Sequence, residues 1–278
     1  MTPSPAPAAL LSYGPHPDQV ADLFLPDGAG GADGARGAGA PLPLVLLFHG
    51  GVWREPHDRV HLRPFAAALA ATGTVVASVE YRRVDGAGGW PETFDDVALA
   101  GDLLPDLVDA SGAGVRVDRR AVALAGHSAG GHLALWSALR HLTDRTSPGH
   151  RAAPLPVAGV AALGAVVALT EFWRTSPDRP TVERLMGGDP TAVAGRYAAA
   201  DPALLGPSAC PVVLVHGSDD EAVPVQSARD HAASRARVRL VELPGTGHFD
   251  VIDPASAAWP AVVDAVWSAL GRPRPTVT

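Results

Sequence analysis

Residues 121–142 read AVALAGHSAGGHLALWSALRHL, and they join a candidate strand to a candidate helix through a glycine-flanked serine. A short apolar run typical of a buried strand is followed at once by Gly126-His127-Ser128-Ala129-Gly130, and then by a segment of helical composition. A serine on a tight turn between a strand and a helix projects its hydroxyl from the end of the sheet, where the helix N-terminus adds partial positive charge. The pattern G-x-S-x-G in this setting predicts that Ser128 is a nucleophile.

The rest of the chain repeats the alternation of strand and helix. Apolar or β-branched runs predict strands within residues 19–26, 41–50, 74–81, 157–169, 211–217 and 238–243, and helices are expected over 61–72, 94–110 and 255–270. Pro105 is expected at a kink or a boundary of its helix. Short apolar strands that alternate with helices indicate a mostly parallel sheet covered by helices on both faces. Ligands of such sheets bind beyond the carboxyl ends of the strands.

We expect one domain over residues 1–278, because α/β architectures of this size commonly form around one sheet. Residues 28–40, GAGGADGARGAGA, predict a flexible insert. Residues 170–207 interrupt the strand and helix rhythm with several prolines, and we interpret them as a small cap inserted after the sixth strand.

Composition and charge narrow the classes of function. A net charge of −7 without a long basic run argues against partners such as nucleic acid or a membrane and favours a small neutral molecule. The only cysteine, Cys210, precedes an apolar run and is expected to be a buried structural thiol. The chain lacks H-E-x-x-H and Cys/His clusters, so neither a metal nor another cofactor is expected. The N-terminal residues do not resemble a signal peptide and no run reaches about 18 apolar residues, so a cytoplasmic location is expected.

Three further segments carry candidate catalytic groups. His49-Gly50-Gly51 ends an apolar strand, and its glycines allow the backbone to approach a ligand closely. The run PVVLVHGSDDEAVP, residues 211–224, places two acids after a strand, and either Asp219 or Asp220 could accept a hydrogen bond from a catalytic histidine. His248 follows the strand expected at 238–243 and lies in a glycine-rich loop, which makes it the candidate general base.

Taken together, these segments resemble the α/β-hydrolase carboxylesterases with an HGG oxyanion loop, especially the branch that contains kynurenine formamidase-like enzymes. The matching pieces, in order, are Tyr13-Gly14 with QVADLFLP, HGGVW at 49–53, EYRR at 80–83, WPETFDDV at 90–97, GHSAGGHLA at 126–134, HGSDDEAVP at 216–224 and GTGHFDVID at 245–253. The resemblance implies an α/β-hydrolase fold and the order Ser128, Asp220, His248 for the triad. It also favours Asp220 over Asp219, and it implies an oxyanion hole built from the N–H groups of Gly50, Gly51 and Ala129.

The expected activity is hydrolysis of a carboxylic ester of a small molecule through an acyl-enzyme. Two alternatives stay open: a kynurenine formamidase-like hydrolase of an N-formyl amide, and a non-catalytic ligand-binding relative. Trp53, Phe172 and Trp173 could line a substrate pocket or pack in the core. Glu80, Arg82 and Arg83 are expected to form a structural ion-pair network rather than to bind substrate. Exposed apolar surface could mediate a homodimer.

Overall fold

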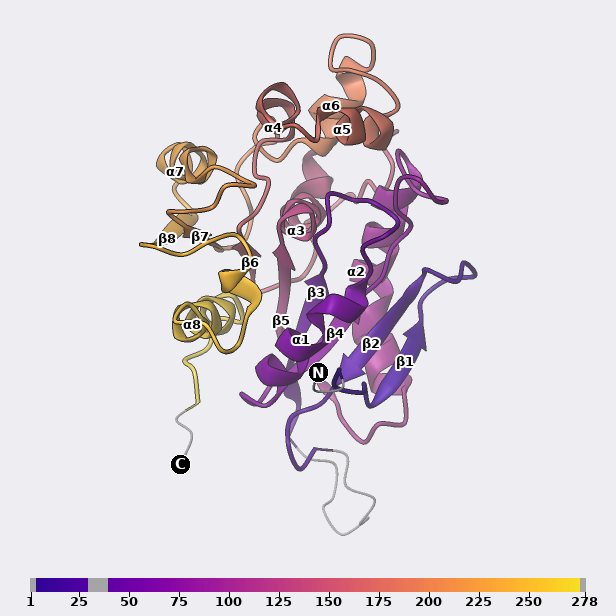
Figure 1. The fold of residues 1–278 in the computed structure, drawn as a ribbon. Helices are drawn as coiled ribbons and strands as arrows, with labels where there is room; N and C mark the ends of the chain where they lie inside the picture. Colours follow the sequence, from indigo (N-terminus) through magenta and orange to yellow (C-terminus); the bar gives the residue numbers. More distant parts are fainter. Residues whose placement is uncertain (1–3, 30–39, 276–278) are drawn as a thin grey trace.

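The structure is a computed structural model that describes residues 4–29 and 40–275. Most of the glycine-rich insert predicted at 28–40 lies outside the described residues, so its flexibility stays a prediction. Within the described chain, one sheet organises the fold (Figure 1).

The sheet has eight strands in the order β1-β2-β4-β3-β5-β6-β7-β8. The strands β1 and β2 pair antiparallel with each other, β2 pairs antiparallel with β4, and all the remaining pairs are parallel. The mostly parallel sheet predicted from the sequence is confirmed. The strands are β1 Ala9–Ser12, β2 Val20–Phe24, β3 Leu42–Phe48, β4 Val75–Val79, β5 Val117–His127, β6 Gly159–Leu163, β7 Val212–Gly217 and β8 Val238–Leu243.

Helices cover both faces of the sheet because the strand side chains alternate between two apolar cores. In β3, Leu44 and Leu46 belong to the core under α2 (Glu92–Ala110) and α3 (Ala129–Leu139). Val45 and Leu47 belong to the core under α1 (Arg63–Ala70) and α8 (Trp259–Ala269). A strand buried on both faces has no polar side, which explains the continuous apolar runs of the sequence.

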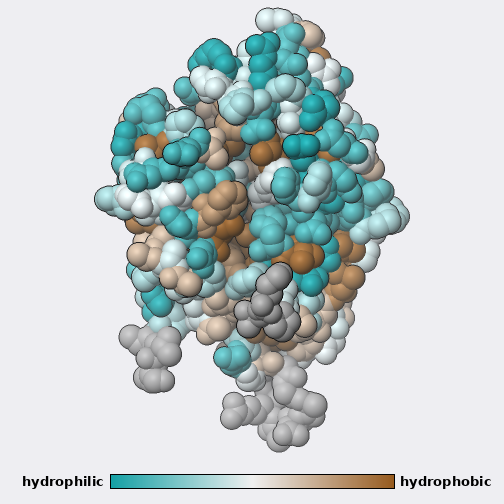
Figure 2. Space-filling view, viewed as in Figure 1, coloured by the Kyte–Doolittle hydropathy of each residue, from teal (hydrophilic) through white to brown (hydrophobic). Residues whose placement is uncertain are grey.

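Three short helices lie between β6 and β7, and apart from the first residue of the first helix they fall within the range 170–207 that was predicted to form a cap. They are α4 Leu169–Thr175, α5 Arg179–Met186 and α6 Ala194–Ala200, and they stand beyond the carboxyl ends of the strands (Figure 1). The next helix, α7 (Val225–Ala233), follows β7. In the space-filling view, most of the visible face is hydrophilic and the hydrophobic residues form small separate patches (Figure 2).

The structure narrows one local expectation and corrects another. Of the two positions expected for Pro105, a kink or a boundary, the boundary is ruled out: Pro105 lies inside α2, and the helix continues because Leu104 and Val108 are buried in the core next to it. The lost N–H of one proline therefore does not end a helix that its neighbours anchor. The strand predicted at residue 121 begins at Val117, since β5 starts with the half-polar run Val-Asp-Arg-Arg at the edge of the apolar core.

Candidate active site

The turn between β5 and α3 holds Ser128 in a strained backbone conformation. Ser128 has φ 54° and ψ −119°, a region that residues with a side chain rarely adopt. A Cβ at Gly126 would lie 2.2 Å from the carbonyl oxygen of Gly130, and a Cβ at Gly130 would lie 2.2 Å from that of Phe48. Both contacts are with backbone that cannot move aside, so the two glycines of the motif are required by packing.

Asp220 and His248 form a close pair beside this turn. The Nδ1–H of His248 donates to Oδ2 of Asp220 over 2.7 Å, and the Asp220 side chain is almost fully buried. Asp219, the other acid considered, is exposed and accepts a hydrogen bond from the hydroxyl of its neighbour Ser218. The structure therefore brings Asp220, and not Asp219, to His248.

Further donors surround the Asp220 carboxylate. The N–H groups of Ala222 and Val223 donate to Oδ1 over 3.0 and 2.8 Å, and Nε2 of His216 lies 3.2 Å from Oδ2. Burial alone raises the pKa of Asp220, but the hydrogen bonds from His216, His248 and Val223 outweigh it and leave that pKa well below its usual value. Asp220 is therefore ionised at neutral pH. His216 was quoted only as part of the motif HGSDDEAVP, since its contact with the acid depends on the bend after β7.

His127 ties the loop of His248 to the serine turn. Its Nε2–H donates to the carbonyl oxygen of His248 over 2.9 Å, and the two rings lie 4.5 Å apart. Burial, and then the charge of His248, lower the pKa of His127 to about 3, so its ring is neutral at pH 7. A neutral, buried imidazole that donates to a carbonyl fits a supporting position rather than proton transfer.

Gly164, at the end of β6, leaves room for the pair. A Cβ at this position would lie 3.2 Å from Nδ1 of His248 and 3.3 Å from Oδ2 of Asp220, and its φ is 50°. Gly164 was not predicted to belong to the site, because it lies within an apolar run and nothing in the run indicates which loop it meets.

The segment after β3 brings its glycines to the serine. A Cβ at Gly50 would lie 3.1 Å from Cβ of Ser128, and Gly51 has φ 104°, so the backbone approaches closely at both positions. Among the described residues, no hydrogen-bond acceptor takes the N–H groups of Gly50 and Gly51. Ala129 is the first residue of α3, where N–H groups have no partner inside the helix. The three amides predicted for the oxyanion hole thus belong to segments that flank Ser128.

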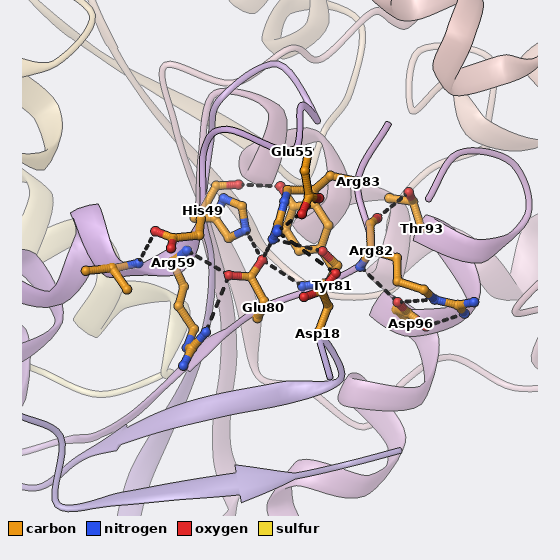
Figure 3. A network of polar contacts seen from close by, with 12 residues as sticks. Asp18, His49, Glu55, Arg59, Glu80, Tyr81, Arg82, Arg83, Thr93 and Asp96 are labelled. Carbon is orange, nitrogen blue, oxygen red and sulfur yellow. Dashed lines mark hydrogen bonds and ion pairs between the residues drawn. The ribbon is translucent and has the colours of Figure 1, made fainter. Parts of the chain in front are cut away.

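His49 is held in place by a buried polar network (Figure 3). Its Nε2 lies 2.8 Å from Oε1 of Glu80, its carbonyl oxygen accepts a hydrogen bond of 2.7 Å from the hydroxyl of Tyr81, and the two rings stack at 4.4 Å. Burial lowers the pKa of His49 to about 3. The network orients the start of the glycine segment.

The three charged residues quoted from EYRR make ion pairs, as predicted. Glu80 pairs with Arg83 and also accepts a hydrogen bond from the N–H of Arg59, whereas Arg82 binds both carboxylate oxygens of Asp96 (Figure 3). Glu80 and Arg83 are buried. These contacts support the structural interpretation of the cluster.

The aromatic residues suggested for a pocket do not all lie together. Trp53 is fully buried, and its ring lies 6.2 Å from that of Phe172 in an edge-to-face arrangement. Phe172 lines a cavity between the cap and α7. Trp173 points elsewhere, since its Nε1–H donates to Glu183 and the guanidinium of Arg179 lies over its ring. Trp53 and Phe172 are thus neighbours, and Trp173 contacts cap residues.

Three remaining features concern groups outside this site. Cys210 is half-buried and not buried as predicted, because it lies in the loop before β7, and burial raises the pKa of its thiol. Among residues 4–29 and 40–275, no group of three or more His, Cys, Asp or Glu side chains could hold a metal ion. In the same part of the chain, every helix is too short or too polar to span a membrane.

The sheet, the strained serine turn and the buried Asp220–His248 pair define the chain as an α/β-hydrolase. Residues 35–234 match the model of the BD-FAE family, and the chain belongs to this family. It is 33% identical over 235 residues to Esterase LipC of Mycobacterium tuberculosis, a match that covers 77% of this chain and 55% of LipC. The chain spans about half the length of the curated relatives it matches.

Solved structures share the fold at low identity. A truncated form of a carbohydrate esterase from gut microbiota superposes with a TM-score of 0.76 at 18% identity, and the match covers 96% of this chain and 100% of the other. The propionate-bound esterase Est2 of Thermogutta terrifontis gives a TM-score of 0.69 at 19% identity, with 97% of each chain covered. The predicted α/β-hydrolase fold is confirmed by these likenesses.

Proposed function

We propose that this chain is a serine hydrolase that cleaves a carboxylic ester of a small molecule. The observation that carries the proposal is the 2.7 Å hydrogen bond between His248 and Asp220, next to a serine held in a strained turn. A histidine oriented by a buried carboxylate is the arrangement that activates a serine hydroxyl. The names of the relatives, Esterase LipC among them, support the same class of reaction.

In the proposed reaction, Nε2 of His248 takes the proton of the Ser128 hydroxyl while Oγ attacks the ester carbonyl. The N–H groups of Gly50, Gly51 and Ala129 stabilise the negative oxygen of the tetrahedral intermediate. His248 then gives the proton to the departing alcohol, which leaves an acyl group on Ser128. A water molecule, deprotonated by the same histidine, attacks the acyl group; the bond to Oγ of Ser128 breaks, His248 returns the proton to Oγ, and the carboxylic acid leaves. Asp220 stays ionised throughout, which fits its lowered pKa.

Intact mass after treatment with a fluorophosphonate, together with turnover of p-nitrophenyl esters, tests the proposal. We expect a single covalent adduct on Ser128 and ester turnover that Ser128→Ala lowers by about 10⁴-fold or more while the protein stays folded. A folded chain that takes no label and turns over no ester would favour the non-catalytic ligand-binding alternative. N-formylkynurenine is measured alongside, because the formamidase-like alternative predicts that it is the better substrate.

A further inference from the structure

A cavity of about 160 Å³ lies between the cap and α7, at the carboxyl ends of β6 and β7. Residues that follow β6, residues of α4 and the first residues of α7 form its wall. Six apolar residues make up most of this wall: Val166, Val167, Ala168, Phe172, Val223 and Pro224. A concave, largely apolar space with a few polar groups is the usual character of a small-molecule site.

Hydrogen bonds connect two wall residues directly to the candidate catalytic groups. The N–H of Val166 donates to the carbonyl oxygen of Ser128 over 3.3 Å. The N–H of Val223 donates to Oδ1 of Asp220 over 2.8 Å. The cavity therefore lies against both the nucleophile turn and the acid loop.

We propose that this cavity binds an uncharged apolar group of about six carbons that belongs to the ester substrate, a proposal that rests on the proposed function. A cavity of about 150 Å³ with an apolar lining holds one benzene molecule, so a cyclic or linear group of that size fits the space. The group can belong to the acyl part or to the alcohol part of the ester, and the two are distinguished by experiment.

Charge in the wall restricts the group further. Glu171 is the one ionisable residue among those that line the cavity in the described chain, and it is half-buried. Its carboxylate makes no ion pair with another described residue. An unpaired negative charge beside an apolar space repels a carboxylate, so the site disfavours esters whose apolar part ends in an anion.

The test changes the volume of the cavity from two sides. Ser227→Phe fills it from a half-buried position on α7, and Phe172→Ala enlarges it from α4. Each variant is measured on p-nitrophenyl esters of increasing acyl length and on acetate esters of increasing alcohol length. In one of the two series, we expect Ser227→Phe to lower kcat/KM for esters with a six-carbon group about tenfold relative to kcat/KM for esters with a two-carbon group. Phe172→Ala should move the optimum in the same series to longer groups.

Ala233→Phe is the matched control, because it adds the same ring to an exposed position on α7 that does not line the cavity. It should leave both length profiles as in the unaltered chain. Length profiles that stay unchanged in both volume variants, with fluorophosphonate labelling intact, would overturn the cavity inference and leave the proposed function standing. If the folded, unaltered chain takes no fluorophosphonate label and turns over no ester, the proposed function is overturned and the inference with it.

The effect of charge is tested separately with Glu171→Gln. Relative to a neutral ester of equal length, kcat/KM for an ester that carries a terminal carboxylate should rise roughly threefold. Glu221→Gln, which removes an exposed carboxylate that does not line the cavity, should leave this ratio unchanged. An equal rise in both variants would show that the general charge of the surface, and not Glu171, excludes anions.

Discussion

The carbonyl oxygen of His248 accepts a hydrogen bond of 2.9 Å from Nε2–H of His127, the residue immediately before Ser128. The serine turn and the histidine loop are more than a hundred residues apart in sequence, and this bond joins them directly. Because the bond is made to the main chain of His248, it leaves the His248 ring free to contact Asp220.

Replacing His127 should therefore disturb the position of His248. We expect His127→Ala to lower kcat by about ten- to a hundredfold with a smaller change in KM, because a small displacement of a catalytic base slows proton transfer more than it weakens binding. His127→Gln, which keeps a donor, should recover part of the loss. His150→Ala serves as the control, and an equal loss of kcat in that variant would show that the effect is not specific to this bond.

Asp220 and Asp219 allow a sharp comparison within one loop. Asp220→Asn should lower kcat by about 10⁴-fold, since the amide no longer fixes the tautomer of His248 or stabilises its charged form. Asp219→Asn removes an exposed carboxylate and should change kcat less than about twofold. Steady-state kinetics of both purified variants check the prediction, and a collapse of the rate only in Asp219→Asn would refute the assignment of the acid.

Buried histidines make the stability of the protein depend on pH. Burial lowers the pKa of His49 and His127 to about 3 and that of His132 to about 4. In an unfolded chain the pKa of a histidine is about 6.5. Between these values the unfolded chain binds more protons than the folded one. The free energy of unfolding is therefore fully retained above about pH 6.5 and falls as the pH drops toward 4, by up to about 1.4 kcal/mol per pH unit for each histidine.

Urea unfolding at several pH values between 7 and 5 measures this loss. His132→Gln keeps a donor for the carbonyl of Ala200 and should flatten the dependence on pH, whereas His57→Gln, at an exposed position, should leave its slope unchanged. A free energy of unfolding that stays constant from pH 7 to 5 would contradict the prediction.

The sequence was sufficient to predict those features that depend on local pattern. The apolar runs predicted the parallel strands because each is buried on both faces, as Val45 and Leu46 of β3 are in the two cores. The motif around Ser128 located the strained turn because its glycines meet fixed backbone at short range. Contacts between distant loops carry no such local pattern, so the approach of His216 to Asp220 and the space left by Gly164 were not predicted. The short strand β1 was also missed, since its pairing with β2 depends on tertiary contact.

The positions of the three aromatic residues suggested for a pocket also depend on tertiary packing that the sequence does not reveal. Trp53, Phe172 and Trp173 were grouped by residue type, yet the direction of a side chain on a short helix depends on which face packs down. Phe172 is buried toward Trp53, whereas Trp173, the next residue on α4, turns toward Arg179 and Glu183. Successive residues on a helix point about 100° apart, so neighbouring aromatic residues rarely share one pocket.

The network behind His49 predicts a large difference between two glutamates. Glu80 is buried with Arg83 and contacts His49 and the N–H of Arg59, whereas Glu242 pairs with Arg229 at the surface. Removing one partner of a buried pair leaves an uncompensated charge, so Glu80→Gln should lower the free energy of unfolding by about 3 to 5 kcal/mol. Glu242→Gln breaks an exposed pair and should cost less than about 1 kcal/mol. Because Glu80 also orients His49, Glu80→Gln should slow fluorophosphonate labelling of Ser128 under conditions where the variant is still folded. Urea unfolding and labelling rates check both parts, and similar losses of stability in the two variants would show that the Glu80 network does not hold this segment.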